Sequence, residues 1–349
     1  MTPSDAPPGP PEPFTELTVG PPIPAPPRGS EEAAEAWLGG TAAAGWDAAP
    51  LPADASSRRY WRLTGPKGAT MLLMQAPPET VAPFTSMAAH LRLLGLAAPE
   101  ILDAAPEEGL ALVEDLGPET LAARLARKPK GEAKASRLVA DLLAFLARTQ
   151  PPAALPPLGP TEGAAQLAPL FEHYAATPPE AAEALRAGLR GRLTELGCVP
   201  DHLSLRDFHA ENLIWRKGES GLRRLGIIDF QDAVLAPRAY DLASWITDAR
   251  RDAAPGLAEE VTARFAAALE LPERQIAAEV AVLGLMRSLR ILGLFARLAR
   301  HGRRSYLAFV PRVYTHVETC LTHPAAAQLA PLVRAAAPPP EALLPGRAP

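Results

Sequence analysis

The sequence predicts an α+β protein of two lobes, a small lobe that contains strands and a larger helical lobe. Short strand-like segments and one helical segment follow one another up to residue 115, whereas helical periodicity dominates from residue 120 onward. One strand-rich segment, 204–232, interrupts these helices. We therefore divide the chain into a small lobe over 31–115 and a large lobe over 116–335, with a hairpin at their junction.

The small lobe begins with a predicted helix over 31–38, which Ser30 can cap. Two strands follow at 60–63 and 70–74, and the Gly- and Pro-containing segment 64–68 between them is typical of a tight turn. Apolar spacing then predicts a further helix, followed by two more strands. These three elements cover 84–94, 100–104 and 110–114.

Six segments of the large lobe carry helical periodicity, with apolar residues recurring every three or four positions. Between them, two apolar strands at 212–215 and 225–229 are joined by the polar turn 216–221, which predicts a hairpin. The predicted helices are 121–126, 134–149, 164–176, 179–196, 256–268 and 275–300.

Proline sets the two ends of the chain apart, with 41 prolines among 349 residues and 11 of them before Arg28. Because proline lacks an amide hydrogen and fixes φ, we expect residues 1–30 to form an extended or disordered tail and residues 336–349 a shorter one. The first tail could also bind a partner domain in the polyproline II conformation.

Composition excludes several classes of protein. The net charge of −4 argues against a general nucleic-acid binder. The two cysteines, Cys198 and Cys320, lie far apart without partners at ligand spacing, which excludes a disulfide framework and a structural zinc site. No uncharged apolar run reaches the roughly 18 residues of a membrane span, and no secretory signal is found. We expect a cytoplasmic, monomeric enzyme that binds neither membranes nor nucleic acid.

Three polar residues at the predicted hairpin indicate the chemistry. Asp207 lies five residues before Asn212, where the first strand begins, and Asp229 ends the second strand. A hairpin brings Asn212 and Asp229 together, and their oxygens suit Mg²⁺ with phosphate oxygens completing its shell. Asp207 is then available to orient or deprotonate an attacking hydroxyl. The pattern predicts phosphoryl transfer.

These residues resemble a known family. Asp-x-x-x-x-Asn followed by a strand that ends in Asp-Phe is the phosphoryl-transfer signature of kinase-fold enzymes. The form found at 206–212 and 227–233 is similar to the aminoglycoside-phosphotransferase-like branch. Within it, the chain resembles the bacterial anomeric kinases of cell-wall amino sugars. The further segments that carry this resemblance are 54–62, 73–79, 113–117, 237–242 and 290–298.

The resemblance implies a protein-kinase-like fold of two lobes and an enzyme of peptidoglycan recycling. Such an enzyme uses ATP and Mg²⁺ to phosphorylate the anomeric hydroxyl of N-acetylmuramate or N-acetylglucosamine. It implies Asp207 as the catalytic base, Asn212 and Asp229 as metal ligands, and a hinge at Glu114 to Leu116 whose backbone meets adenine. The residues that it places over the phosphates are Ser56, Ser57, Arg58 and Arg59.

The chain departs from the kinase pattern in its small lobe and before the base. The histidine often found two residues before the base is Leu205 here, and no G-x-G-x-x-G loop occurs, so a Ser-containing turn would donate its amides. The phosphate-binding lysine is missing, since Lys67, the one lysine of the small lobe, lies in a turn. Arg58 or Arg59 could supply the charge, and strand alternation puts them on opposite faces.

Charged residues outside the signature are candidates for substrate contacts. We expect Arg206, next to the base, to contact the substrate. Asp232 is either a sugar-side carboxylate or a helix cap. Arg287 and Arg290 share a helix face with Arg297. That face is either a solvated stripe or a cationic wall of the cleft, which would suit the lactyl carboxylate of N-acetylmuramate.

We expect structural roles for three other residues. We expect His209 to bond the backbone of its own loop, and Asp241 to cap the helix after it while bonding the loop of Asp207. Glu114 is expected at the hinge for its backbone, with its side chain in solvent.

Two other functions are open at this point. A kinase of the same fold could act on an aminoglycoside or an amino alcohol, although a cationic substrate needs an acidic cleft and several arginines are candidates for this one. The missing lysine would also suit a catalytically silent nucleotide-binding scaffold.

Overall fold

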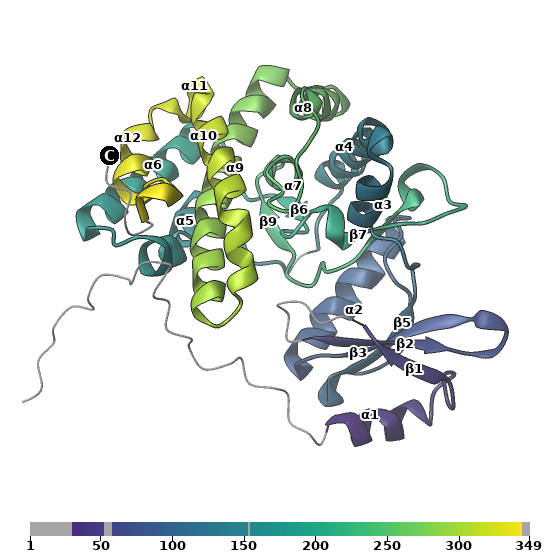
Figure 1. Ribbon diagram of the computed structural model, residues 1–349. Helices are drawn as coiled ribbons and strands as arrows, with labels where there is room; N and C mark the ends of the chain where they lie inside the picture. The colour runs from purple at the N-terminus through teal and green to yellow at the C-terminus, as the bar shows by residue number, and fades with distance from the viewer. Residues whose placement is uncertain (1–29, 52–57, 153, 344–349) are drawn as a thin grey trace, which may run out of the picture.

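The structure, a computed structural model, describes residues 30–51, 58–152 and 154–343. A small sheet-containing lobe and a larger helical lobe form the molecule (Figure 1). The predicted two-lobed α+β fold is confirmed. Most of the two predicted tails, residues 1–29 and 344–349, lies outside the described residues.

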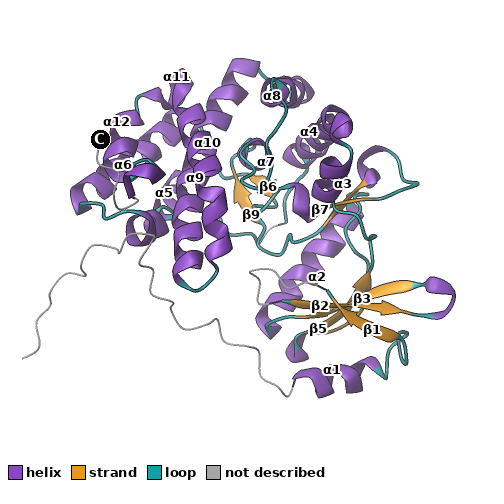
Figure 2. Ribbon diagram, viewed as in Figure 1, coloured by secondary structure: helices purple, strands orange, loops and turns teal. Residues whose placement is uncertain are grey.

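The small lobe is an antiparallel sheet in the order β1-β2-β3-β5-β4, with helix α1 on one side and α2 on the other (Figure 2). The four predicted strands lie within one residue of their expected bounds. The sequence does not predict β1, because Asp-Ala-Ala-Pro contains no β-branched or aromatic residue. The elements are α1 (Ser30–Leu38), β1 (Asp47–Pro50), β2 (Arg59–Thr64), β3 (Thr70–Gln75), α2 (Pro78–Leu93), β4 (Ile101–Ala105) and β5 (Leu110–Glu114).

The large lobe is built around the 28-residue helix α9 (Glu273–Arg300), which packs against α7, α8 and α10 (Figure 1). Two short antiparallel pairs, β6–β9 and β7–β8, lie on the side that meets the small lobe. The strands are β6 (His202–Ser204), β7 (Leu213–Trp215), β8 (Leu225–Ile227) and β9 (Val234–Ala236). The other helices are α3 (Leu121–Arg127), α4 (Glu132–Arg148), α5 (Pro160–Ala165), α6 (Pro179–Glu195), α7 (Tyr240–Ile246), α8 (Leu257–Ala268), α10 (Val310–Thr322), α11 (Pro324–Ala327) and α12 (Ala330–Ala336).

The helix predicted over 164–176 is not continuous. Helix α5 ends at Ala165, and a separate π-helical turn covers Leu170–Tyr174. Gly293 of α9 explains the break, because a Cβ at this position would lie 2.2 Å from the backbone nitrogen of Leu170. The backbone before the turn packs directly on α9, a long-range contact that helical periodicity cannot indicate.

The large lobe continues past the predicted boundary at residue 335. Ala336 and Ala337 are fully buried in its core. The hydroxyl of Tyr174 donates to the carbonyl of Pro338 at 2.9 Å, and that of Tyr314 donates to the carbonyl of Ala337. Alanine side chains pack here although prolines follow, so composition alone puts the start of the tail too early.

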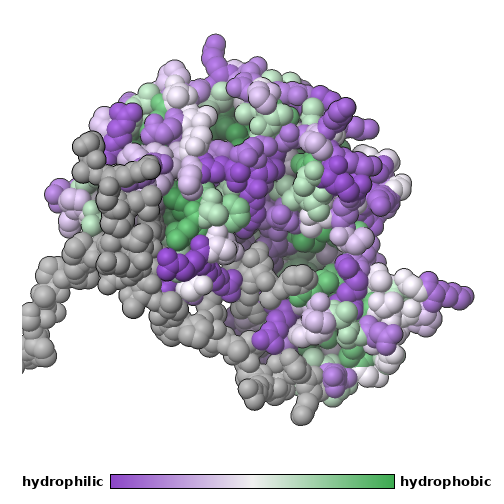
Figure 3. All heavy atoms as spheres, viewed as in Figure 1, coloured by the Kyte–Doolittle hydropathy of each residue, from purple (hydrophilic) through white to green (hydrophobic). Residues whose placement is uncertain are grey.

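None of the described helices is both long enough and apolar enough to cross a bilayer. On the face drawn in Figure 3, hydrophilic residues cover much of the surface and hydrophobic residues show in separate small patches.

Two contacts fix the β7–β8 hairpin to the small lobe. The amide of Ile227 donates to the carbonyl of Ala97 at 2.8 Å, just after α2. The ring of Phe84 on α2 stacks on that of Phe230 with centroids 5.1 Å apart. Phe230 follows Asp229 directly, so the packing of α2 determines where this aspartate lies.

Candidate active site

Asp241 of α7 anchors the start of the loop that carries Asp207. Its buried carboxylate accepts hydrogen bonds from the Ser204 hydroxyl (2.7 Å) and from the amides of Leu205 (2.7 Å) and Arg206 (3.2 Å). Burial raises the pKa of Asp241 to about 6, although these hydrogen bonds act in the opposite direction. The predicted bond between Asp241 and the loop is therefore found.

The hairpin brings the three signature residues into one cavity. The side-chain amide of Asn212 donates to the backbone carbonyl of Asp207 at 2.8 Å and to Oδ2 of Asp229 at 3.3 Å. Asp229 has a left-handed backbone with φ of 59°, a conformation that aspartate tolerates better than most residues. Burial raises its pKa, while a hydrogen bond from Gln231 and the charge of Arg58 lower it.

His209 and Asp248 complete the loop. Nε2 of His209 lies 3.3 Å from the amide nitrogen of Asn212, so the ring contacts this side chain and not the loop backbone as predicted. Burial lowers the pKa of His209 to about 4, which makes the ring neutral. Asp248 accepts from the amide of Ala210 at 3.4 Å. Sequence reasoning misses Asp248, because no motif marks it apart from a position seven residues after Asp241.

The cavity has a volume of about 350 Å³. The loop and hairpin contribute carboxylates, whereas α9 contributes arginines and, at one end, apolar residues and the ring of Phe295. Hollows of about 560 and 530 Å³ lie around Trp215, but none of the signature residues lines them. The smaller cavity is therefore the candidate site.

Of the residues expected over the phosphates, Arg58 reaches the cavity. Its Nη1 lies 3.3 Å from Oδ1 of Asp229, and its side chain is 9% exposed. Arg59, the first residue of β2, does not line the cavity. The geometry thus favours Arg58 over Arg59 as a cation at this site. Ser56 and Ser57 lie outside the described residues.

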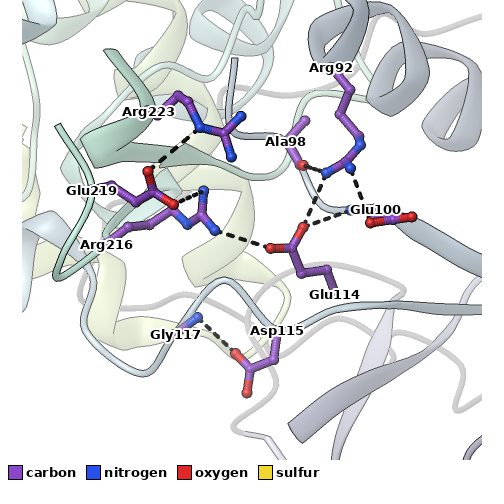
Figure 4. Close-up of polar contacts among 9 residues, drawn as sticks. All are labelled: Arg92, Ala98, Glu100, Glu114, Asp115, Gly117, Arg216, Glu219 and Arg223. Atoms are coloured by element: carbon purple, nitrogen blue, oxygen red, sulfur yellow. Dashed lines mark hydrogen bonds and ion pairs between the residues drawn. The ribbon is translucent and has the colours of Figure 1, made fainter. Parts of the chain in front are cut away.

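The Glu114 side chain connects the two lobes, so the interpretation that it is solvated is wrong. Figure 4 shows its carboxylate between Arg92 of α2 and Arg216, which follows β7 in the large lobe. The two ion pairs measure 3.2 and 3.1 Å, and the amide of Glu100 donates to the same carboxylate. A charged residue at a strand end usually faces solvent, and only the tertiary structure supplies these partners.

Asp115 and Leu116, the next two residues of the hinge, also contact neighbouring elements. Asp115 pairs with Arg62 of β2 at 2.7 Å and accepts from the amide of Gly117 at 3.0 Å. Leu116 is buried and packs close to β8, since a Cβ on Gly226 would lie 3.0 Å from its Cδ1. The hinge is a fixed turn of the chain.

The arginines of α9 form a wall of the cavity. Arg287, Arg290 and Arg297 all line it. Arg287 is 4% exposed, and burial lowers the pKa of Arg290. The alternative of a solvated stripe is therefore wrong for the first two, and only Arg297 is exposed.

The two predicted helix caps are wrong, and the substrate contact of Arg206 stays a prediction. Arg206 does not line the cavity, although its charge acts on Arg290, which does, and it has a left-handed backbone with φ of 68°. Asp232 does line it, but β9 follows this residue instead of a helix, so it caps nothing. Asp241 does not cap α7 either, because Ala239 occupies the cap position and makes no side-chain bond there.

Comparison with known proteins agrees with this geometry. Residues 47–280 match the model of the family described as the phosphotransferase enzyme family. The chain belongs to this family. A relative from Caulobacter vibrioides, named N-acetylmuramate/N-acetylglucosamine kinase, is 35% identical over 302 residues, which cover 81% of each chain. A relative of the same name from Neisseria meningitidis is 27% identical and covers 80% of this chain and 86% of its own.

Solved structures of the phosphotransferase family share the fold. A putative aminoglycoside phosphotransferase from Ralstonia eutropha has a TM-score of 0.62 at 13% identity, over 85% of this chain and 98% of its own. A choline/ethanolamine kinase family protein from Mesorhizobium loti has a TM-score of 0.60 at 14% identity, over 87% and 99%. These structures show the fold, and the family match together with the kinase relatives shows a phosphotransferase that transfers to a hydroxyl group.

Proposed function

We propose that this phosphotransferase uses ATP to phosphorylate the anomeric hydroxyl of N-acetylmuramate and N-acetylglucosamine, giving the sugar 1-phosphates. The names of its relatives support this substrate class. The observation that carries the proposal is the convergence of Asp207, Asn212 and Asp229 on one cavity whose opposite wall bears arginines.

The donor set fits a divalent cation of the Mg²⁺ type. Among the described residues no group of three His, Cys, Asp or Glu side chains could hold a metal ion. The Asn212 and Asp229 side chains instead lie in contact, and each carries a hard oxygen donor of the kind that suits an ion shared with phosphate oxygens. When bound, Mg²⁺ neutralises charge that develops on the phosphates.

The residues of the chain have separate tasks in this reaction. Asp207 accepts the proton of the sugar hydroxyl, and the Asp241 and Asp248 carboxylates hold its loop in place. An anomeric hydroxyl is more acidic than an ordinary alcohol, so weak base assistance suffices and positioning supplies most of the rate. Arg58 lies beside Asp229 and takes the place of the missing lysine as the cation for the phosphates.

The arginine wall argues against the alternative substrates. An aminoglycoside or amino alcohol carries positive charge and would meet Arg287 and Arg290 across the cavity. All three signature residues, Asp207, Asn212 and Asp229, are present, which argues against a silent scaffold.

The product itself tests the proposal. Purified protein, ATP and Mg²⁺ are incubated with N-acetylmuramate or N-acetylglucosamine, and ³¹P NMR identifies the phosphorylated carbon. We expect a sugar 1-phosphate in both reactions. ADP release with an aminoglycoside or amino alcohol but with neither sugar would overturn the substrate class, and a 6-phosphate would overturn the position of transfer.

A further inference from the structure

Arg287 is a buried cation near the Asp241 carboxylate, whose pKa its charge lowers, but part of its guanidinium has no hydrogen bond among the described residues. It lies on α9, lines the cavity and is 4% exposed. Neither Nε nor Nη1 of its guanidinium has a hydrogen-bond partner within the described part of the chain. Its guanidinium carbon lies 5.6 Å from the centre of the Tyr240 ring, a contact that satisfies no N–H donor. A buried charge that lacks hydrogen bonds is costly, so a ligand that supplies them would be favoured.

Other buried polar atoms of residues that line this cavity also lack hydrogen-bond partners among the described residues. The Ser244 hydroxyl of α7 is 1% exposed, lines the cavity and has no hydrogen-bond partner among the residues described. Nδ1 of His209, on the ring next to Asn212, is also buried without a hydrogen-bond partner among the described residues. Buried polar groups in native proteins are nearly always paired. Their concentration in one cavity therefore points to a ligand that accepts several hydrogen bonds.

The charges around Arg287 define the chemistry of this ligand. The nearby Asp241 carboxylate already accepts three hydrogen bonds from the loop. Arg290 and Arg250 add positive charge to the same cavity. A planar anion that accepts two hydrogen bonds, such as a carboxylate, is the best match to a guanidinium.

We propose that Arg287, Ser244 and Arg290 form a carboxylate subsite that binds the acidic side chain of N-acetylmuramate and makes the enzyme prefer this sugar to N-acetylglucosamine. This inference rests on the proposed function. The two sugars differ only by the lactyl group, so they report directly on the subsite. In the proposed reaction the phosphates of ATP bind beside Asp229 and Arg58, apart from this subsite.

The ratio of kcat/KM for the two sugars tests the subsite in Arg287→Met, Arg290→Met and Ser244→Ala. A hydrogen-bonded charge is worth roughly 10- to 100-fold, so we expect the ratio of N-acetylmuramate to N-acetylglucosamine to fall by about that factor in the arginine variants. Ser244→Ala removes a single neutral donor and should lower the ratio about threefold to tenfold. Arg274→Met, on the exposed start of α9 and away from the cavity, is the matched control and should leave the ratio unchanged.

Equal losses for both sugars would overturn the subsite, because they would indicate a role in phosphoryl transfer or in folding. Thermal unfolding of each variant identifies a folding defect, and Arg290→Met and Ser244→Ala decide the question if Arg287→Met does not fold.

Calorimetry without nucleotide separates the subsite from the proposed reaction. Wild-type protein should bind N-acetylmuramate more tightly than N-acetylglucosamine, and Arg290→Met should remove the difference. If both sugars bind as expected but neither is phosphorylated, the proposed function fails and the subsite stands. Equal affinity of wild-type protein for the two sugars would overturn the subsite even where both are turned over.

Discussion

The hinge and the α9 wall both contain partly or fully buried arginines, but those of the hinge have ion-pair partners and Arg287 of the wall has donors without partners among the described residues. At the hinge, the Glu114 carboxylate lies between Arg92 and Arg216, and Asp115 pairs with Arg62. On the α9 wall, Arg287 is more deeply buried and has two donor nitrogens without partners among the described residues. The paired charges of the hinge stabilise the contact between the lobes, whereas we propose that the unpaired donors of Arg287 bind a ligand. Variants of the first kind should change stability, and variants of the second kind should change activity.

Among variants expected to change activity, Asp207→Asn should cause the largest loss of kcat. Loss of a general base costs about 10²- to 10⁴-fold in rate, so kcat should fall roughly 1,000-fold. The KM for ATP and the melting temperature should stay close to wild-type values, because Asp207 contributes only its backbone carbonyl to the contact with Asn212. Steady-state kinetics and calorimetric melting measure both. Near wild-type turnover would show that Asp207 is not the base.

Asp241 should give the next largest effect, on stability as a function of pH. Its pKa in the folded protein is about 6, above the usual value of 3.8, so the folded state binds the proton more tightly than the unfolded state. The stability contributed by protonation is complete below about pH 4 and is lost as the pH rises through 6. Urea unfolding should show wild-type protein losing about 2–3 kcal/mol relative to Asp241→Asn across this window. Parallel pH profiles of the two proteins would contradict this assignment.

Arg58→Met tests whether Arg58 supplies the positive charge that binds the phosphates of ATP. Removing the cation beside Asp229 should raise the KM for ATP about tenfold, and Arg58→Lys should recover part of the loss because it keeps the charge. Arg59→Met is the matched control, since Arg59 does not line the cavity. A larger effect at Arg59 than at Arg58 would exchange their roles.

The hinge should give the smallest effect. A double-mutant cycle with Glu114→Gln and Arg216→Met should yield a coupling energy of about 1 kcal/mol in unfolding, because both side chains are partly buried. The pair of Glu219 and Arg223, also drawn in Figure 4, has a more exposed arginine (51% against 15% for Arg216) and should couple by less than about 0.5 kcal/mol. Equal coupling in the two pairs would mean that burial at the hinge adds nothing.

Local patterns predict most of the architecture. The strands of the small lobe lie within one residue of their expected bounds, because alternating apolar residues and Gly-Pro turns are encoded locally. The π-helical turn at Leu170–Tyr174 is not predicted, since it depends on contact with Gly293 more than a hundred residues away. The strand β1 is missed for a similar reason, because pairing with β2 and not its own composition makes it a strand.

The sequence by itself determined the signature of Asp207, Asn212 and Asp229, because a short hairpin fixes which residues meet at its ends. It also predicted that Arg58 or Arg59 supplies the cation for the phosphates. Only the tertiary structure decided that Arg58 faces Asp229, that Glu114 joins the lobes and that Arg287 and Ser244 are buried in the same cavity. Burial and pairing of a charge depend on what distant segments place next to it, and the spacing of residues along one helix or strand does not contain that information.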